Sequence, residues 1–346
     1  MRGIDLQMAF SLNKQSAIGT AVDVSDVDRM LPYRTFAPAT QDFPDALSDK
    51  DWYGKGNSFA SFWDPITKRV TLASREYSLS HLSALFAPAM VMGALETTNP
   101  NSAQGTVFAH KFTFQDPKTS PEPIYTTVIE KMGGIYQRAI SGVVVEQFTF
   151  NGVRTDHVTV AWQGWGRKME TDATSLPALS AQSFFKTILG TFKFSAAPAT
   201  TNISTKIISW NLTLNQNATP WYMPGSAPGE ESLVTRGLIG KQGASGQIVV
   251  LLGDAVQKAL FEANTECALQ IVLRGDQIGT TGMYYQVTIE IPHLKIPTEA
   301  FGEEQDQVTY TIPFTEQSIL YGGVDDYVSV TVQTDEDDSA LLEVSP

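Results

Sequence analysis

Apolar and polar residues alternate with a period of two along much of this chain. The clearest examples are residues 286–291 (QVTIEI) and 308–314 (VTYTIPF). Alternation of this kind, rich in β-branched and aromatic residues, predicts strands with one buried face. We interpret these two segments as an antiparallel strand pair joined by the acidic connection 297–307. Such a pair is not stable by itself, so its Val/Ile face must pack against another sheet.

Most of the remaining regular structure is also predicted to be strand. The further predicted strands are residues 4–14, 69–73, 110–115, 125–131, 142–150, 157–162, 184–194 (or a short helix and then a strand), 206–214, 246–252, 268–273 and 327–333. Helical spacing occurs at 77–92, ending near Pro88, and at 254–264, capped by Asp254. The sequence therefore predicts a mainly β protein with few helices.

Two long segments show neither period and are predicted to be irregular. They are residues 16–61, the first arm, and residues 215–245, the second arm. A long structureless loop is unusual inside a compact domain, whereas an extended arm on a neighbouring molecule would bury its aromatic side chains. The candidate contact residues of the arms are Tyr33, Phe36, Phe43, Trp52, Tyr53, Trp221, Tyr222, Met223 and Leu233.

The order of elements repeats along the chain. Each half reads as a strand, an arm, a strand, one helix and then several antiparallel strands. Residues 195–204 (SAAPATTNIS) are small and polar and are the best linker candidate. We interpret the order as a tandem duplication, with domains at 1–195 and 201–346 and an acidic tail on the second.

Charge is concentrated at one end of the sequence. The chain has 346 residues, 42% hydrophobic and 18% charged, with a formal net charge of −13. From residue 296 onward there are 12 acidic residues and no Lys or Arg. An acidic surface repels phosphates and argues against ordinary nucleic-acid binding. A solvated acidic tail is the simplest interpretation. No run of roughly 18 apolar residues, the length that spans a bilayer, is present.

Motifs for catalysis or metal binding are sparse. A single cysteine, Cys267, excludes an intrachain disulfide and is predicted to be a buried structural thiol, which fits folding in a reducing cytoplasm. The acidic run 335–338 lacks the spacing of a calcium loop. No cofactor, metal or catalytic constellation is predicted. Four scattered histidines are expected to be structural, and three strand glutamates have no visible partner: His81, His110, His157 and His293, and Glu130, Glu146 and Glu290.

With this order of elements in view, the sequence resembles the tail tube proteins of long-tailed bacteriophages. The resemblance covers most of the chain through weak motifs. They are FSLNKQSAIGTA (10–21), SLSHLSALFAPAM (78–90), AHKFTFQDP (109–117), ISGVVVEQFTFNG (140–152), VTVAWQGWGRK (158–168) and WNLTLNQN (210–217).

The resemblance implies two tandem β-sandwich or half-barrel domains, each with a flanking helix and a projecting loop. It also implies a structural virion protein, not an enzyme, made and assembled in the host bacterial cytoplasm. Its copies would form rings, as trimers of the duplicated chain or alternatively as hexamers, and the rings would stack into a tube. Expected partners are the tape measure, terminator and distal tail proteins. DNA would pass through without specific binding, along a lumen for which the acidic candidates are Glu303, Glu304, Asp306, Asp325 and Asp326.

Other functions are compatible with the same pattern. A distal tail, baseplate or tail-completion protein of related fold is the main alternative. A β-sandwich that binds carbohydrate or a receptor would present a groove of exposed Trp and Tyr. A glycoside hydrolase would need two carboxylates across a cleft.

Overall fold

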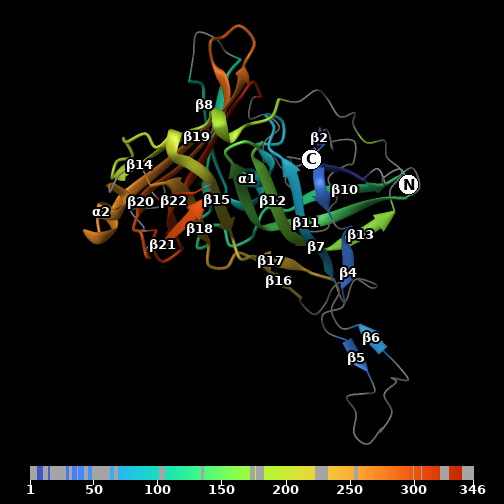
Figure 1. Cartoon of the computed structure of the whole chain (residues 1–346). Helices are drawn as coiled ribbons and strands as arrows, with labels where there is room; N and C mark the ends of the chain where they lie inside the picture. The colour runs from blue at the N-terminus through green and yellow to red at the C-terminus, as the bar shows by residue number, and fades with distance from the viewer. Residues whose placement is uncertain are drawn as a thin grey trace, which may run out of the picture.

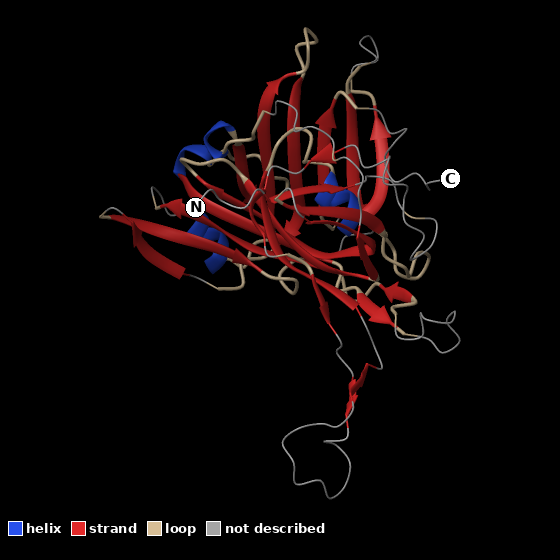
Figure 2. Ribbon diagram, turned by 90° about the vertical axis from the view of Figure 1, so that its right-hand side faces the viewer, coloured by secondary structure: helices blue, strands red, loops and turns tan. Residues whose placement is uncertain are grey.

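Two antiparallel sheets packed face to face make up most of the structure (Figures 1 and 2). The computed structural model describes residues 6–10, 15, 29–30, 33–36, 38–42, 46–48, 63–65, 69–100, 106–133, 136–171, 176, 183–222, 233–252, 256–298, 300–304, 306–319 and 327–336. The predicted mainly β fold is confirmed.

The larger sheet has thirteen strands within these described residues. Its main path runs β2 (Arg29–Met30), β1 (Leu6–Phe10), β10 (Thr126–Met132), β11 (Tyr136–Val153), β15 (Ile207–Asn215), β18 (Gly243–Leu251), β22 (Gln307–Phe314) and β21 (Ala300–Glu304). Beside this path, β12 (Thr159–Gly166) and β13 (Lys168–Thr171) pair with β11, and β7 (Arg69–Ser78) pairs with β12. Finally, β3 (Tyr33–Phe36) and β4 (Thr40–Asp42) pair with β7.

The smaller sheet has six strands in the described part of the chain. Their order is β14 (Thr191–Ala196), β19 (Cys267–Gln277), β20 (Tyr284–Leu294), β23 (Ser329–Thr334), β9 (Phe108–Phe114) and β8 (Gly93–Thr98). Two short hairpins lie outside both sheets, β5 (Ala46–Ser48) with β6 (Trp63–Pro65), and β16 (Thr219–Trp221) with β17 (Arg236–Leu238). The helices are α1 (Phe86–Val91) and α2 (Val256–Glu262).

One large apolar core lies between the sheets and draws on the whole length of the chain. The Phe192 and Trp210 rings, one from each sheet, are 5.9 Å apart. Helix α1 is buried in the same core, where the ring of Phe86 lies 5.4 Å from that of Trp162. Both sheets combine strands from each side of the predicted boundary near residue 200, because β11 pairs with β15 and β9 pairs with β23.

The predicted pairing of 286–291 with 308–314 was wrong. These segments belong to β20 and β22, which lie in different sheets. Strand β20 has β19 and β23 on its two sides, and β22 has β18 and β21, so neither is free to pair with the other. The connection itself contains β21. Alternation in a sequence indicates a buried face but does not identify the neighbouring strand.

The arms and the first helix also differ from prediction. The first arm contains β2, β3, β4 and β5 among its described residues, and the second contains β16 and β17. Strands this short have too few positions to show alternation. Helix α1 begins only at Phe86, because residues 77–78 belong to β7 and residues 81–85 form turns. Pro88 lies within the first turn of α1, where amide hydrogens have no partner in the helix and proline is tolerated. Asp254, the predicted cap of α2, lies outside the described residues.

Substitution of two adjacent residues of β20 tests which face of the strand lies in the core and which lies outside. Ile289 is fully buried between Ile271 and Val330, whereas Thr288 points to the other side. Ile289→Ala is expected to lower the free energy of unfolding by about 2–5 kcal/mol, because a buried cavity would remain. Thr288→Ala, the matched control, should change it by less than about 0.5 kcal/mol. Denaturant unfolding of the unassembled chain measures both, and equal losses would contradict the assignment.

Candidate assembly surfaces

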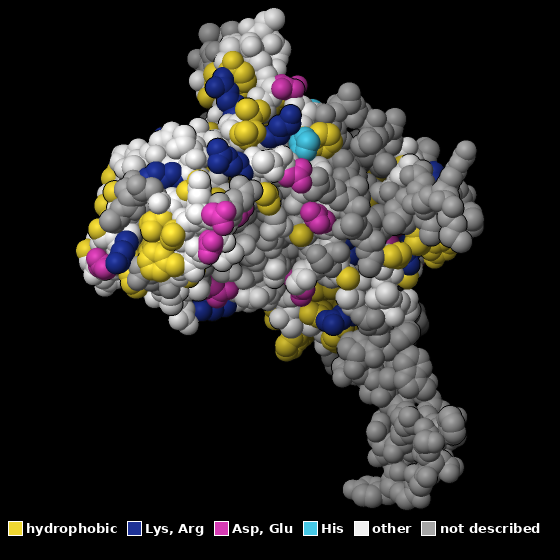
Figure 3. All heavy atoms as spheres, in the orientation of Figure 1, with side chains coloured by type: hydrophobic (Ala, Val, Ile, Leu, Met, Phe, Trp, Pro, Cys, Tyr) yellow, Lys and Arg dark blue, Asp and Glu magenta, His cyan; other side chains and the backbone are white. Residues whose placement is uncertain are grey.

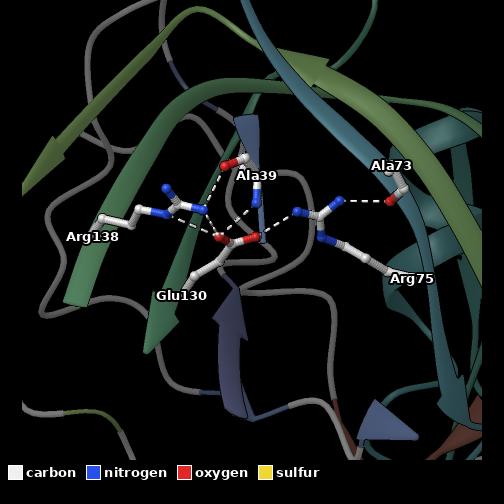
Figure 4. A network of polar contacts seen from close by, with 5 residues as sticks. All are labelled: Ala39, Ala73, Arg75, Glu130 and Arg138. Carbon is white, nitrogen blue, oxygen red and sulfur yellow. Dashed lines mark hydrogen bonds and ion pairs between the residues drawn. The ribbon is translucent and has the colours of Figure 1, made fainter. Parts of the chain in front are cut away.

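A buried carboxylate with two guanidinium partners lies at the base of the first arm (Figure 4). Glu130 of β10 accepts a hydrogen bond from Arg75 Nη2 at 2.5 Å on Oε1. Its Oε2 accepts from Arg138 Nη2 at 2.7 Å and from Arg138 Nε at 3.0 Å. The Ala39 backbone N–H also donates to Oε2, at 3.1 Å. Arg75 and Arg138 donate in turn to the carbonyls of Ala73 and Ala39, both at 2.6 Å. Every contact in this network is therefore charge-assisted.

This network fastens the first arm to the larger sheet. Among the described residues of the arm, Ala39 takes part in it and is held through both its N–H and its carbonyl. Strands β3 and β4 flank Ala39 and continue the attachment by pairing with β7. Beyond this anchor the β5–β6 hairpin lies well away from both sheets in two perpendicular views (Figures 1 and 2). The arm therefore has a fixed base and a projecting end.

The sequence alone indicates no partner for Glu130, whereas the structure shows two, Arg75 and Arg138. The available signal was its position, because Glu130 follows Val128 by two residues and so shares the inward face of its strand. A charged residue on an inward face needs a buried partner of opposite charge. The partners themselves lie on β7 and β11, and no local spacing could identify them.

The Glu130 network predicts a large and specific loss of stability. Glu130→Gln leaves two buried guanidinium groups without their counter-charge and is expected to lower the free energy of unfolding by about 3–5 kcal/mol. Limited proteolysis within residues 43–68 should accelerate, because the arm base loosens.

The matched control is Glu290→Gln on β20, a half-buried carboxylate that accepts a hydrogen bond from Gln270 at 2.7 Å. Glu290→Gln should lower the free energy of unfolding by less than about 1 kcal/mol. If both variants unfold at the same denaturant concentration as the unmodified protein, the network does not hold the arm.

The second arm folds back onto the protein. Trp165 Nε1 donates to the Ala218 carbonyl at 3.1 Å, and the Gly237 N–H donates to the hydroxyl of Tyr125 at 2.7 Å. These contacts, with Val144 and Val234, form a separate small apolar cluster. Burial raises the pKa of the Tyr125 hydroxyl, and the neighbouring Glu122 carboxylate raises it further.

The candidate contact residues of the arms have different environments. Leu233 is buried, and Tyr222 packs against the small cluster of the second arm. Trp221 is 48% exposed and remains available to a neighbouring molecule. Tyr33 and Phe36 lie in β3, where the structure describes the backbone pairing only. Four other candidates, Phe43, Trp52, Tyr53 and Met223, lie outside the described residues.

The acidic candidates lie at the edge of the larger sheet. Glu303 and Glu304 belong to β21, which is exposed along its whole length, and Asp306 is exposed in the turn to β22 with a positive φ of 61°. The register places Glu303 opposite Val308 and Glu304 opposite Gln307, so the two carboxylates point to opposite sides of the sheet. Asp325 and Asp326 lie outside the described residues.

The same sheet edge carries exposed apolar side chains. Phe301 is 51% exposed and Val308 is 54% exposed, although both point toward the core side of their strands. Val256 at the start of α2 is 48% exposed. Figure 3 shows hydrophobic side chains gathered at the end of the molecule where β21 and α2 lie. An edge strand with exposed apolar residues is a surface suited to pairing with another chain.

Two of the residues predicted to be structural, His110 and Cys267, are buried, whereas the side chains of His157 and His293 are partly exposed. His110 is fully buried, with Nδ1 3.0 Å from Thr97 Oγ1 and Nε2 2.8 Å from the Glu336 carbonyl. Cys267 is buried at the start of β19, and burial, with Glu266 nearby, raises the pKa of its thiol to about 11. A thiol of this kind is unreactive at neutral pH. Among the described residues there is no cluster of metal-binding side chains, and no helix is long and apolar enough to cross a membrane.

Fold and surfaces together define an antiparallel β protein with an open sheet edge and an anchored projecting hairpin, features of a subunit that assembles with others. The chain belongs to the phage tail tube protein family, whose family model matches residues 70–315. This family is a structural component of the virion tail and is not a class of enzymes. No curated protein matches the chain in sequence.

Proposed function

We propose that copies of this chain join side by side into rings and that the rings stack into the tail tube through which viral DNA enters the host. The family match over residues 70–315 carries this proposal. The open edge at β21 supports lateral joining, because ring closure pairs or covers exposed strand edges. The tape measure, terminator and distal tail proteins would join the tube in the host cytoplasm.

Three copies per ring is the arrangement that we favour, with a hexamer as the alternative. The supporting observation is that the main path of the larger sheet passes from 1–195 into 201–346 at one place, the β11–β15 pair, so that one chain presents its two halves side by side. Three such units would provide six similar positions around the tube. Glu304, Asp306, Asp325 and Asp326 are proposed to lie toward the lumen, where carboxylates discourage DNA from adhering. The side chain of Glu303, on the same strand as Glu304, points to the opposite side of the sheet.

The β5–β6 hairpin is proposed to connect successive rings. It projects from a base held by Glu130, and so it can reach a neighbouring ring without disturbing the sandwich (Figure 1). Phe301 and Val308, by contrast, lie at the sheet edge and would contact the adjacent copy within a ring.

Electron microscopy of the purified full chain and of a hairpin-deletion variant tests this function. The unmodified protein is expected to form rings and tubes, because both contact surfaces are present. A variant with residues 46–65 replaced by a short Gly/Ser linker should keep its melting temperature and form rings that do not stack. Protein that stays monomeric at high concentration would contradict the tube function, and tubes of normal length from the deletion variant would contradict the role of the hairpin.

A further inference from the structure

A broad face of the larger sheet has no charged side chain across five neighbouring strands. The inward residues of β11 and β15, such as Phe148 and Leu212, lie in the core. Their neighbours in sequence therefore point to the outside of the sandwich. The outward positions are alternate residues of 159–163 in β12, 147–153 in β11, 209–215 in β15, 245–251 in β18 and 309–313 in β22. We call this surface the neutral face.

The strand register arranges the centre of the neutral face in polar rows. One row contains Asn151, Asn211 and Gln247, and the next contains Thr149, Thr213 and Ser245. The hydroxyls of Thr149 and Thr213 form a hydrogen bond between the two strands, with 2.8 Å between their Oγ1 atoms. Amide and hydroxyl groups of this kind are well hydrated but carry no net charge.

Charged residues occur only at the borders of the neutral face. Glu76 lies on β7, Glu146 lies at the bulge of β11, and Glu304 lies on β21. Burial raises the pKa of the Glu146 carboxyl, an effect that nearby Arg69 opposes. The chain as a whole is 18% charged with a net charge of −13, so a charge-free area of this breadth is a specific feature of the surface.

The outer face of the smaller sheet has an ordinary solvent-facing composition. Its outward positions include Lys111, Lys193, Arg274 and Glu290, with both signs of charge interspersed. Mixed charge is typical of protein surfaces in contact with water. The two outer faces of the sandwich therefore differ in chemistry: one is uncharged and the other has mixed charge. In an assembly, the two faces are suited to different surroundings.

The neutral face has the wrong composition for a stable contact with another protein. Interface centres are enriched in aromatic residues, Met and Arg. The neutral face contains none of these residues. Apolar side chains occur mainly toward one end, at Val153 and Val249. A contact between copies is therefore better served by the β21 edge.

We infer that the neutral face lines the lumen and that its occupant is double-stranded DNA, which slides past without binding. The inference rests on the proposed function. DNA carries about one negative charge per 1.7 Å, so each Lys or Arg in a wall would add a salt-dependent contact that resists movement. A neutral polar wall offers no such contact and stays hydrated. Glu304, at the border of this face, would add repulsion at its margin.

Cysteine labelling of assembled tubes tests whether the neutral face points into the lumen. Thr213→Cys and Gln247→Cys place a thiol on the neutral face, and Thr331→Cys places one on the outer face of the smaller sheet as a matched control. Native Cys267 is buried and should stay unlabelled. Each variant is treated with N-ethylmaleimide and with a maleimide coupled to a globular protein too wide to enter the tube, before and after assembly.

Before assembly, both reagents should label all three variants. In tubes, Thr213→Cys and Gln247→Cys should react with the small reagent and lose almost all reaction with the bulky one, whereas Thr331→Cys should react with both. The inference is overturned if the bulky reagent labels Gln247→Cys in tubes as readily as Thr331→Cys. It is equally overturned if the small reagent labels neither Thr213→Cys nor Gln247→Cys, because the face would then lie between copies. Failure of the unmodified protein to assemble would count against the proposed function instead.

Discussion

Strand β11 pairs with four other strands, and the rest of the structure depends on this pairing. Its eighteen residues pair with β10 and β13 along the first part and with β12 and β15 along the second. The pairing with β12 begins at Val144, directly after the last residue paired with β10, and it changes register between Val145 and Gln147. Arg138 near one end holds the arm base through Glu130, and Phe148 near the other fills the core between the sheets. One strand thus links the arm anchor, the core and the junction between the halves of the chain.

Charge is distributed unevenly over the structure. The Glu130 network is buried, where ionic contacts are costly unless every partner is satisfied, and it fixes a backbone position at the base of the arm. Exposed carboxylates and apolar side chains share the edge strand β21. The neutral face, formed by the outward positions of β12, β11, β15, β18 and β22, carries neither charged nor aromatic side chains. In the proposed tube, these three surfaces would have different neighbours: the arm would contact the next ring, the edge the next subunit, and the neutral face the lumen.

The sequence predicted the strands well because each long strand has one face in the core, and burial imposes alternation on residues such as Val287, Ile289 and Ile291. It did not predict which strands are neighbours, and so β20 and β22 were paired across what proved to be two sheets. The short strands of the arms were not predicted because two to four residues are too few to show alternation. Among the site residues, the exposure of Glu303 and Glu304 follows from their polar neighbours in sequence. The burial of Leu233 and the partners of Glu130 depend on tertiary contacts that no local pattern contains.

We propose that each chain supplies two tandem halves to a ring, and the symmetry of the assembled tube is the most direct test of this proposal. Cryo-electron microscopy of purified tails, reconstructed without imposed rotational symmetry, measures the number of chains in each ring. The account predicts three chains per ring, with alternating, similar but distinguishable densities at six positions around the lumen. Six identical densities, each fitted by a complete copy of the chain, would contradict it.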